Sequence, residues 1–241
     1  MKEESVSVKQ GKKALFYLIV QYQTDKIEAE RTIQMGNGNR GNIMIIKNGL
    51  VFTPEGKFEK KDLYVEGEYV AKETTDNKEV EAEGCYVIPG LVDIHFHGCV
   101  RHDMCDGTEE SIQALADYEA ANGVLAICPA TMTIPEEELF QAMKAAKEHK
   151  NGKGADLVGI NMEGPFINKE KKGAQKEEDI KLADIELFHK LQEAAGGLIK
   201  LVDLAPETEG AMDFINQVKD EVHVSIAHTM ADYDTASEAI R

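Results

Sequence analysis

The chain has 241 residues and a formal net charge of −17, from 27 Lys and Arg against 44 Asp and Glu. This excess of negative charge argues against nucleic acid or an anionic membrane surface as a partner, because both repel an acidic protein. The apolar run at residues 14–20 is too short to span a bilayer, and no small-residue cleavage site follows it. The four cysteines show no Cys-x-x-Cys spacing, which indicates reduced thiols and a cytoplasmic location.

The first 43 residues fit poorly with the rest of the chain. They mix charges with one short apolar run and a Gly/Asn-rich stretch at residues 36–42, which has the composition of a linker. We expect residues 1–43 to be an extension that is disordered or lies outside the fold. Met44 has the character of a natural start.

Residues 44–85 have the pattern of a small domain of antiparallel strands. Residues 44–53 predict two strands separated by a turn at Asn48-Gly49. A second turn is expected at residues 54–56, and residues 63–70 predict a third strand and the start of a fourth.

From residue 86 to residue 241 strands and helices alternate. About five β/α units at a period of about 30–40 residues are typical of a TIM barrel, which needs eight strands, so the sequence looks cut short. No Gly-x-Gly-x-x-Gly follows any expected strand, so no dinucleotide fingerprint is present. The predicted strands are 87–97, 124–127, 157–161, 198–204 and 222–227. Helices are expected to be capped by Thr108, by Thr133 with Glu136, and by Asp184, with further helices over 208–219 and from about Asp232.

Two histidines end the first of these strands. His95 and His97 are two residues apart, so in a strand they project on one face and form half of a metal site. The alternative is a pair of hydrogen-bonded histidines near a strand end.

Two further candidate ligands follow later strands. Glu163 ends the third strand, and His228 ends the fifth. Taken singly, Glu163 could be a loop carboxylate and His228 a hydrogen-bonded strand-end histidine. Together with His95 and His97 they fall at the strand ends where barrel chemistry is located, which favours a site for a divalent metal such as zinc or iron.

Three motifs then resemble a known family. Residues 89–98, Pro-Gly-Leu-Val-Asp-Ile-His-Phe-His-Gly, are similar to the first-strand motif of the amidohydrolase superfamily. Residues 161–167, Asn-Met-Glu-Gly-Pro-Phe-Ile, with Lys-Gly-Ala-Gln at 172–175, resemble the N-acetylglucosamine-6-phosphate deacetylase family. Residues 227–232 fit the fifth-strand histidine of that family, and the resemblance covers about residues 44–241.

The resemblance implies an α/β fold, a (β/α)8 barrel with a small N-terminal β-sandwich, and a homodimer. It implies hydrolysis of N-acetylglucosamine 6-phosphate to acetate and glucosamine 6-phosphate by a metal-dependent mechanism. Glu163 and His228 would hold a metal, His95 and His97 a second one, and Ala174 and Gln175 would contact the sugar. The family's general-base Asp and a sixth-strand His would lie beyond Arg241, so we expect no catalytic base in the chain as given, and an inactive fragment.

Two other hypotheses stay open. The chain could be a catalytically dead metal-binding remnant that associates with another chain. It could also be another amidohydrolase, such as a dihydroorotase-like enzyme with a carboxylated Lys on the fourth strand. Lys200 lies on that strand, but near its start, which disfavours this hypothesis.

Overall fold

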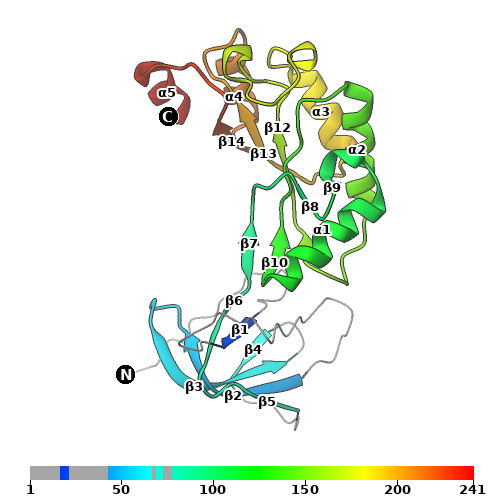
Figure 1. Cartoon of the computed structure of the whole chain (residues 1–241). Helices are drawn as coiled ribbons and strands as arrows, with labels where there is room; N and C mark the ends of the chain where they lie inside the picture. The colour runs from blue at the N-terminus through cyan, green and yellow to red at the C-terminus, as the bar shows by residue number, and fades with distance from the viewer. Residues whose placement is uncertain (1–16, 22–42, 67–68, 73–77) are drawn as a thin grey trace. The chain divides into compact units, whose positions relative to one another are not determined.

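The computed structural model describes residues 17–21, 43–66, 69–72 and 78–241. The chain divides into two compact units, Met1–Gly90 and Leu91–Arg241, each described here by itself (Figure 1). Within the described residues, no helix is both long and apolar enough to cross a bilayer.

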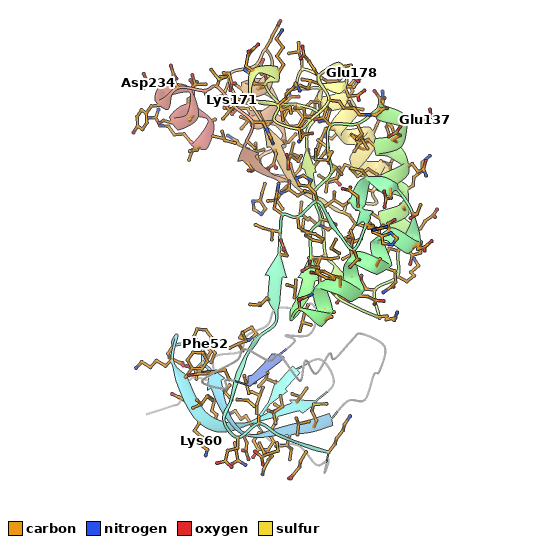
Figure 2. The ribbon with its side chains drawn as sticks, in the orientation of Figure 1. Phe52, Lys60, Glu137, Lys171, Glu178 and Asp234 are labelled. Carbon is orange, nitrogen blue, oxygen red and sulfur yellow. The ribbon has the colours of Figure 1, made fainter. Side chains whose placement is uncertain are left out.

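A six-stranded sheet forms the first unit, in the order β1-β6-β2-β3-β4, with β5 pairing β2. The sheet is mixed: β5 and β6 both run parallel to β2, whereas the sequence predicted antiparallel strands only. Phe52, Phe58 and Tyr86 bring their rings together at one end of the sheet, where Figure 2 labels Phe52. The strands are β1 Tyr17–Gln21, β2 Ile43–Phe52, β3 Phe58–Glu66, β4 Tyr69–Ala71, β5 Glu79–Glu81 and β6 Cys85–Pro89.

Asn48-Gly49 is a bulge and not the predicted turn. β2 continues through these residues, and its register against β3 shifts between Ile46 and Gly49. Asn48 has a φ of 61°, and its backbone N–H donates to Asp62 Oδ1 at 2.9 Å. Asn tolerates this left-handed conformation in a bulge as well as in a turn, so the sequence signal was ambiguous. The second predicted turn is present, closed by Thr53 N–H donating to the Lys57 carbonyl at 2.8 Å.

Strand β1 lies within residues 1–43, which we expected outside the fold. It pairs antiparallel with β6 from Tyr17 opposite Pro89 to Gln21 opposite Cys85. For these five residues the expectation therefore fails, because a β-prone apolar segment pairs with an open sheet edge. The other residues of 1–42 lie outside the described part of the chain.

The second unit is built from parallel strands and helices. One sheet has the order β11-β10-β7 and another β12-β13-β14, and a parallel bridge between Ala130 and Asn161 joins them. They make an open series of strands with no closed barrel among the described residues. The elements are β7 Leu91–Asp93, β8 Gly98–Cys99, β9 His102–Asp103, α1 Glu109–Ala121, β10 Val124–Ile127, α2 Glu136–Glu148, β11 Asp156–Leu157, β12 Ile160–Glu163, α3 Ile185–Ala194, β13 Ile199–Leu204, α4 Ala211–Val218, β14 His223–Ile226 and α5 Tyr233–Ile240, with short 3-10 turns at Met104–Asp106, Lys169–Lys171 and Glu177–Asp179.

Two predicted strands are each split in the structure. The run 87–97 is divided at Gly90, so β6 pairs in the first unit and β7 pairs with β10. Strand β7 also ends at Asp93, so His95 and His97 follow the strand, whereas the sequence predicted them within it. The run 157–161 is divided at Val158-Gly159, and β11 pairs β10 whereas β12 pairs β13. Gly159 is needed here, since a Cβ would lie 2.6 Å from Lys200 Cγ.

The predicted helix starts are mostly confirmed. Thr108, Asp184 and Asp232 each accept a hydrogen bond from a backbone N–H in the first turn of their helix. The capping box of Thr133 and Glu136 is wrong, because α2 begins after Pro135 with no side-chain cap. The Thr133 hydroxyl is buried without a hydrogen-bond partner.

Candidate metal centre

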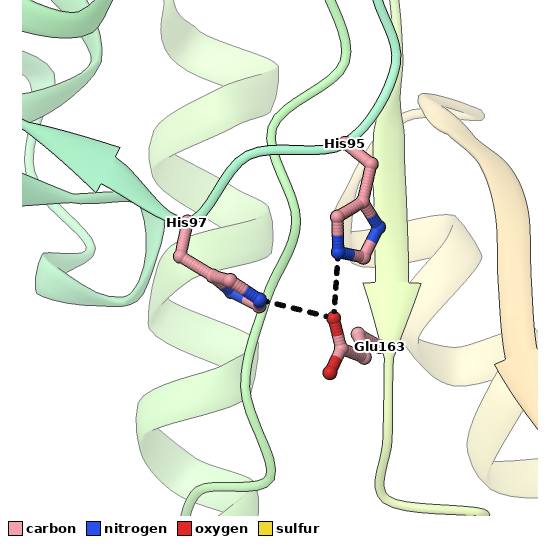
Figure 3. A group of neighbouring side chains, drawn as sticks. All are labelled: His95, His97 and Glu163. Carbon is pink, nitrogen blue, oxygen red and sulfur yellow. Dashed lines mark ion pairs between the residues drawn. The ribbon is translucent and has the colours of Figure 1, made fainter. Parts of the chain in front are cut away.

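Glu163 lies at the middle of a cluster of imidazoles in the second unit. It ends β12, while His95 and His97 lie in the extended segment that follows β7. Their Nε2 atoms lie 3.0 Å and 3.1 Å from the same carboxylate oxygen, Glu163 Oε2 (Figure 3). The structure therefore brings three of the four predicted ligands into one group, with donor atoms within 4.8 Å of one another.

His228, the fourth predicted ligand, approaches the other carboxylate oxygen. Its Nε2 lies 2.6 Å from Glu163 Oε1, which also accepts a hydrogen bond of 2.6 Å from Gln175 Nε2. Only 5% of the Glu163 side chain is exposed, so both oxygens face protein groups. All four sequence-predicted ligands thus meet at one carboxylate.

These imidazoles stabilise the negative charge of the Glu163 carboxylate. Burial raises the pKa of this carboxyl, but hydrogen bonds from His97 and His228 outweigh burial and lower the pKa to about 2. The same contact with Glu163 raises the pKa of His97. The site thus presents Glu163 as an ionised carboxylate in contact with imidazole nitrogens.

The hydrogen bonding of His228 tests whether a metal ion fits here. His228 Nδ1 lies 2.8 Å from the Lys171 carbonyl, which can only accept, so Nδ1 carries the proton. In a neutral ring Nε2 then presents a lone pair to Glu163 Oε1, and two acceptors at that distance require a proton or a cation between them. Imidazole and carboxylate donors of this kind fit a divalent metal such as zinc or iron.

A cavity of about 620 Å³ opens on the cluster. It lies at the C-terminal ends of the parallel strands of the second unit, where ligand sites of α/β proteins occur. The predicted sugar contacts, Ala174 and Gln175, both line it. The lining residues are His95, His97, Asp103, Met132, Glu163, Ala174, Gln175, Asp203, Ala227 and His228.

The oxygen and the nitrogen of the Gln175 side-chain amide both contact protein groups. Its side chain is 2% exposed, and besides donating to Glu163 it accepts a hydrogen bond of 2.5 Å from the Thr133 backbone N–H. Ala174, by contrast, is exposed at the wall of the cavity. Lys200 does not line this cavity; its Nζ donates to the Gly197 carbonyl at 2.7 Å, on the exposed surface.

Sequence reasoning missed two polar residues that touch His95. Asp203 is buried near the end of β13, with Oδ2 3.7 Å from His95 Nδ1, and burial raises the pKa of this carboxyl. The Asn161 amide lies 2.9 Å from the same Nδ1 and donates to the Ile94 carbonyl at 3.2 Å. The strand-end rule that found Glu163 also applies to Asp203, whereas Asn161 carried no such signal.

These observations define a class of structure. It is an open series of parallel strands and helices with a candidate metal centre at the C-terminal ends of the strands. No family model matches the chain. The N-acetylglucosamine-6-phosphate deacetylase of Bacillus subtilis strain 168 is 35% identical over 204 residues, covering 82% of this chain and 50% of the relative. That of Lysinibacillus sphaericus is 27% identical over 206 residues, covering 82% of this chain and 53% of the relative. The chain is therefore related to the N-acetylglucosamine-6-phosphate deacetylases, and spans about half the length of these curated relatives.

Solved structures agree on the fold. The N-acetylglucosamine-6-phosphate deacetylase of Pasteurella multocida matches with a TM-score of 0.73 and 23% identity. The match covers 83% of this chain and 54% of that one. At this identity the likeness carries the fold alone, and it supports the α/β architecture predicted from the sequence.

Proposed function

We propose that the chain carries part of the active site of a metal-dependent deacetylase that releases acetate from N-acetylglucosamine 6-phosphate. The observation that carries the proposal is the convergence of three imidazole Nε2 atoms on the buried carboxylate of Glu163, beside a cavity at the strand ends. The names of the relatives supply the substrate and the reaction.

In this proposal Glu163, His228, His95 and His97 hold one or two divalent ions, zinc or iron. Such an ion would polarise an amide carbonyl as a Lewis acid and would lower the pKa of a water molecule bound to it to about 7. Gln175 holds one carboxylate oxygen of Glu163, and Lys171 holds His228 through its carbonyl. Ala174, which presents only a methyl group, leaves room for the sugar at the wall of the cavity, and Gln175 lies beside it.

The finer architecture belongs to the same proposal: a (β/α)8 barrel of which this chain supplies the first strands, with a β-sandwich in the first unit. We place the protein in the cytoplasm as a homodimer that acts on a small molecule and binds neither nucleic acid nor membrane. The net charge of −17 supports the absence of the last two partners.

We also propose that the chain as given has no turnover of its own. Leu91 and Val92 on the edge strand β7 are 48% and 59% exposed, which is unusual because parallel strands are normally covered. The general base of the family would come from strands other than those of this chain. General acid–base catalysis typically raises a reaction rate about 10²- to 10⁴-fold. A metal-binding protein without catalysis, which joins another chain through these edges, is the second candidate function.

The test is acetate release from N-acetylglucosamine 6-phosphate by the purified chain with added zinc or iron. The assay is repeated after adding a separately expressed C-terminal portion of a homologous deacetylase. We expect activity only in the mixture, and expect Glu163→Gln to abolish it. Turnover by the chain alone would overturn the inactivity, and a mixture that binds metal but stays inactive would favour the second candidate.

A further inference from the structure

The backbone of His228 has an unfavourable conformation that surrounding residues must stabilise. His228 has a φ of 47°, in the left-handed region that a residue with a Cβ enters at a cost. It lies just after β14, and its ring has to reach Glu163 from there. Such a conformation persists only where surrounding contacts determine it.

Two contacts act on His228 directly. Its carbonyl accepts a hydrogen bond of 3.0 Å from the Asn168 N–H, and its Nδ1 donates to the Lys171 carbonyl at 2.8 Å. Both partners come from the segment after β12, where Figure 2 labels Lys171. These contacts hold the carbonyl and the ring of His228. Neither contact involves the residues that follow His228, so those residues need partners of their own.

Glu207 holds the residues that follow. It lies in the turn after β13, and its Oε1 accepts hydrogen bonds from the Met230 N–H at 2.6 Å and from Asn168 Nδ2 at 2.8 Å. Its Oε2 accepts from the Thr229 hydroxyl at 2.5 Å. One carboxylate thus ties together the segments that follow three successive parallel strands, β12, β13 and β14.

The electrostatics of Glu207 agree with this role. Burial raises the pKa of this carboxyl, but donors led by the Thr229 hydroxyl and the Met230 N–H outweigh it and hold the pKa below its usual range. Hydrogen bonds to an ionised acceptor are stronger than those between neutral groups. Glu207 does not line the cavity, so it has no contact with a substrate or metal there.

We infer that Glu207 is a positioning residue, which sets the orientation of His228 toward the candidate metal centre by holding Thr229 and Met230. The inference rests on the proposed function for the role of His228, and it assigns Glu207 no chemistry of its own. The inference does not extend to Glu209, two positions later. Glu209 is exposed, and the structure gives no hydrogen bond or ion pair for it. Orienting groups behind a metal ligand typically contribute about 10- to 100-fold in metal affinity.

The experiment uses the full chain and Co²⁺, whose visible absorption reports the number and geometry of its ligands. Glu207→Ala removes every acceptor and is expected to weaken Co²⁺ binding about tenfold or more and to alter the spectrum. Glu207→Gln keeps one acceptor oxygen for Met230 and Asn168, and its amide can donate to the Thr229 hydroxyl, so affinity and spectrum should return close to wild type. Glu209→Ala is the matched control and should match wild type.

Amide hydrogen exchange without metal gives the second readout. The inference predicts faster exchange at Met230 and Ala231 in Glu207→Ala, with the strands protected as in wild type. Thr229→Val removes one of the three bonds to Glu207 and also the acceptor of the Ala231 N–H. It gives a milder form of the effect on Co²⁺ binding and on exchange at Met230 should Glu207→Ala fail to fold. The inference would be overturned if Glu207→Ala and Thr229→Val both showed the amide exchange and the Co²⁺ spectrum of the wild type. If wild type binds no Co²⁺, the proposed function fails, and the exchange data still decide whether Glu207 holds the segment.

Discussion

His228 Nε2 lies 2.6 Å from Glu163 Oε1, while the proton of the same ring is held on Nδ1 by a backbone carbonyl. A carboxylate facing the lone pair of a neutral imidazole is unfavourable, so this pair is arranged to share a proton or a cation. His95 and His97 place their Nε2 atoms 3.0 Å and 3.1 Å from the second oxygen of Glu163. His95 Nδ1 accepts from the Asn161 amide, so in a neutral His95 ring Nε2 carries the proton and donates to Glu163. The predictions below begin from this relationship.

Glu163→Gln should lower bound zinc or iron at least tenfold, because the amide loses the negative charge and one acceptor oxygen. Metal content is measured by mass spectrometry after dialysis against buffered zinc, and circular dichroism confirms that the fold is kept. Glu178→Gln, an exposed carboxylate labelled in Figure 2, is the control and should retain wild-type metal content. Unchanged metal in a folded Glu163→Gln sample would refute the assignment of Glu163 as a ligand.

Gly164→Ala should destabilise the chain more than Gly173→Ala does. Both glycines have a positive φ, 74° and 58°, so either substitution costs about 1–2 kcal/mol of backbone strain. At Gly164 the new Cβ would also overlap the Thr133 hydroxyl, whereas at Gly173 its nearest neighbour is His228 Cε1 at 3.7 Å. The overlap adds about 1–3 kcal/mol.

Urea unfolding monitored by circular dichroism measures this difference. Displacement of Thr133 should also disturb Gln175, which accepts from its backbone N–H, so Gly164→Ala should bind metal more weakly as well. Equal stabilities of the two variants would mean that the packing around Gly164 relaxes without cost.

Val100→Asn should stabilise the second unit by about 1 kcal/mol. Val100 and Arg101 connect β8 to β9 with φ values of 45° and 69°, a conformation that a β-branched side chain disfavours and that Asn tolerates. Val100 is exposed, so little packing is lost. The same substitution at exposed Val92, which has no positive φ, serves as the control, and thermal unfolding should show no gain there.

The thiols of Cys105 and Cys128 should resist alkylation in the native chain. Burial raises the pKa of each to about 12, and the thiolate is the reactive form. Iodoacetamide at pH 8 followed by peptide mass spectrometry should therefore label both far more slowly in buffer than in 6 M guanidinium. Labelling of either residue at the rate of a free thiol would show that its surroundings open readily.

Features that depend on residues close together in the chain could be predicted before the structure was known. Strand β10 has the predicted bounds of Val124–Ile127, and Thr108, Asp184 and Asp232 cap the predicted helices, because the hydroxyl or carboxylate acts within one helical turn. His95, His97, Glu163 and His228 could be found from their place at strand ends, since parallel strands deliver such residues to one edge.

The places where strands break, and the side chains that share a partner, follow from the assembled fold. The strand runs through Gly90 and Gly159 look continuous in sequence, yet each is divided between different strand partners. Gln175 and Glu207 depend on hydrogen bonds to residues distant in the chain, Thr133 for one and Thr229 for the other. Local patterns carry no information about such partners, because the energy of these contacts arises only when the strands are assembled.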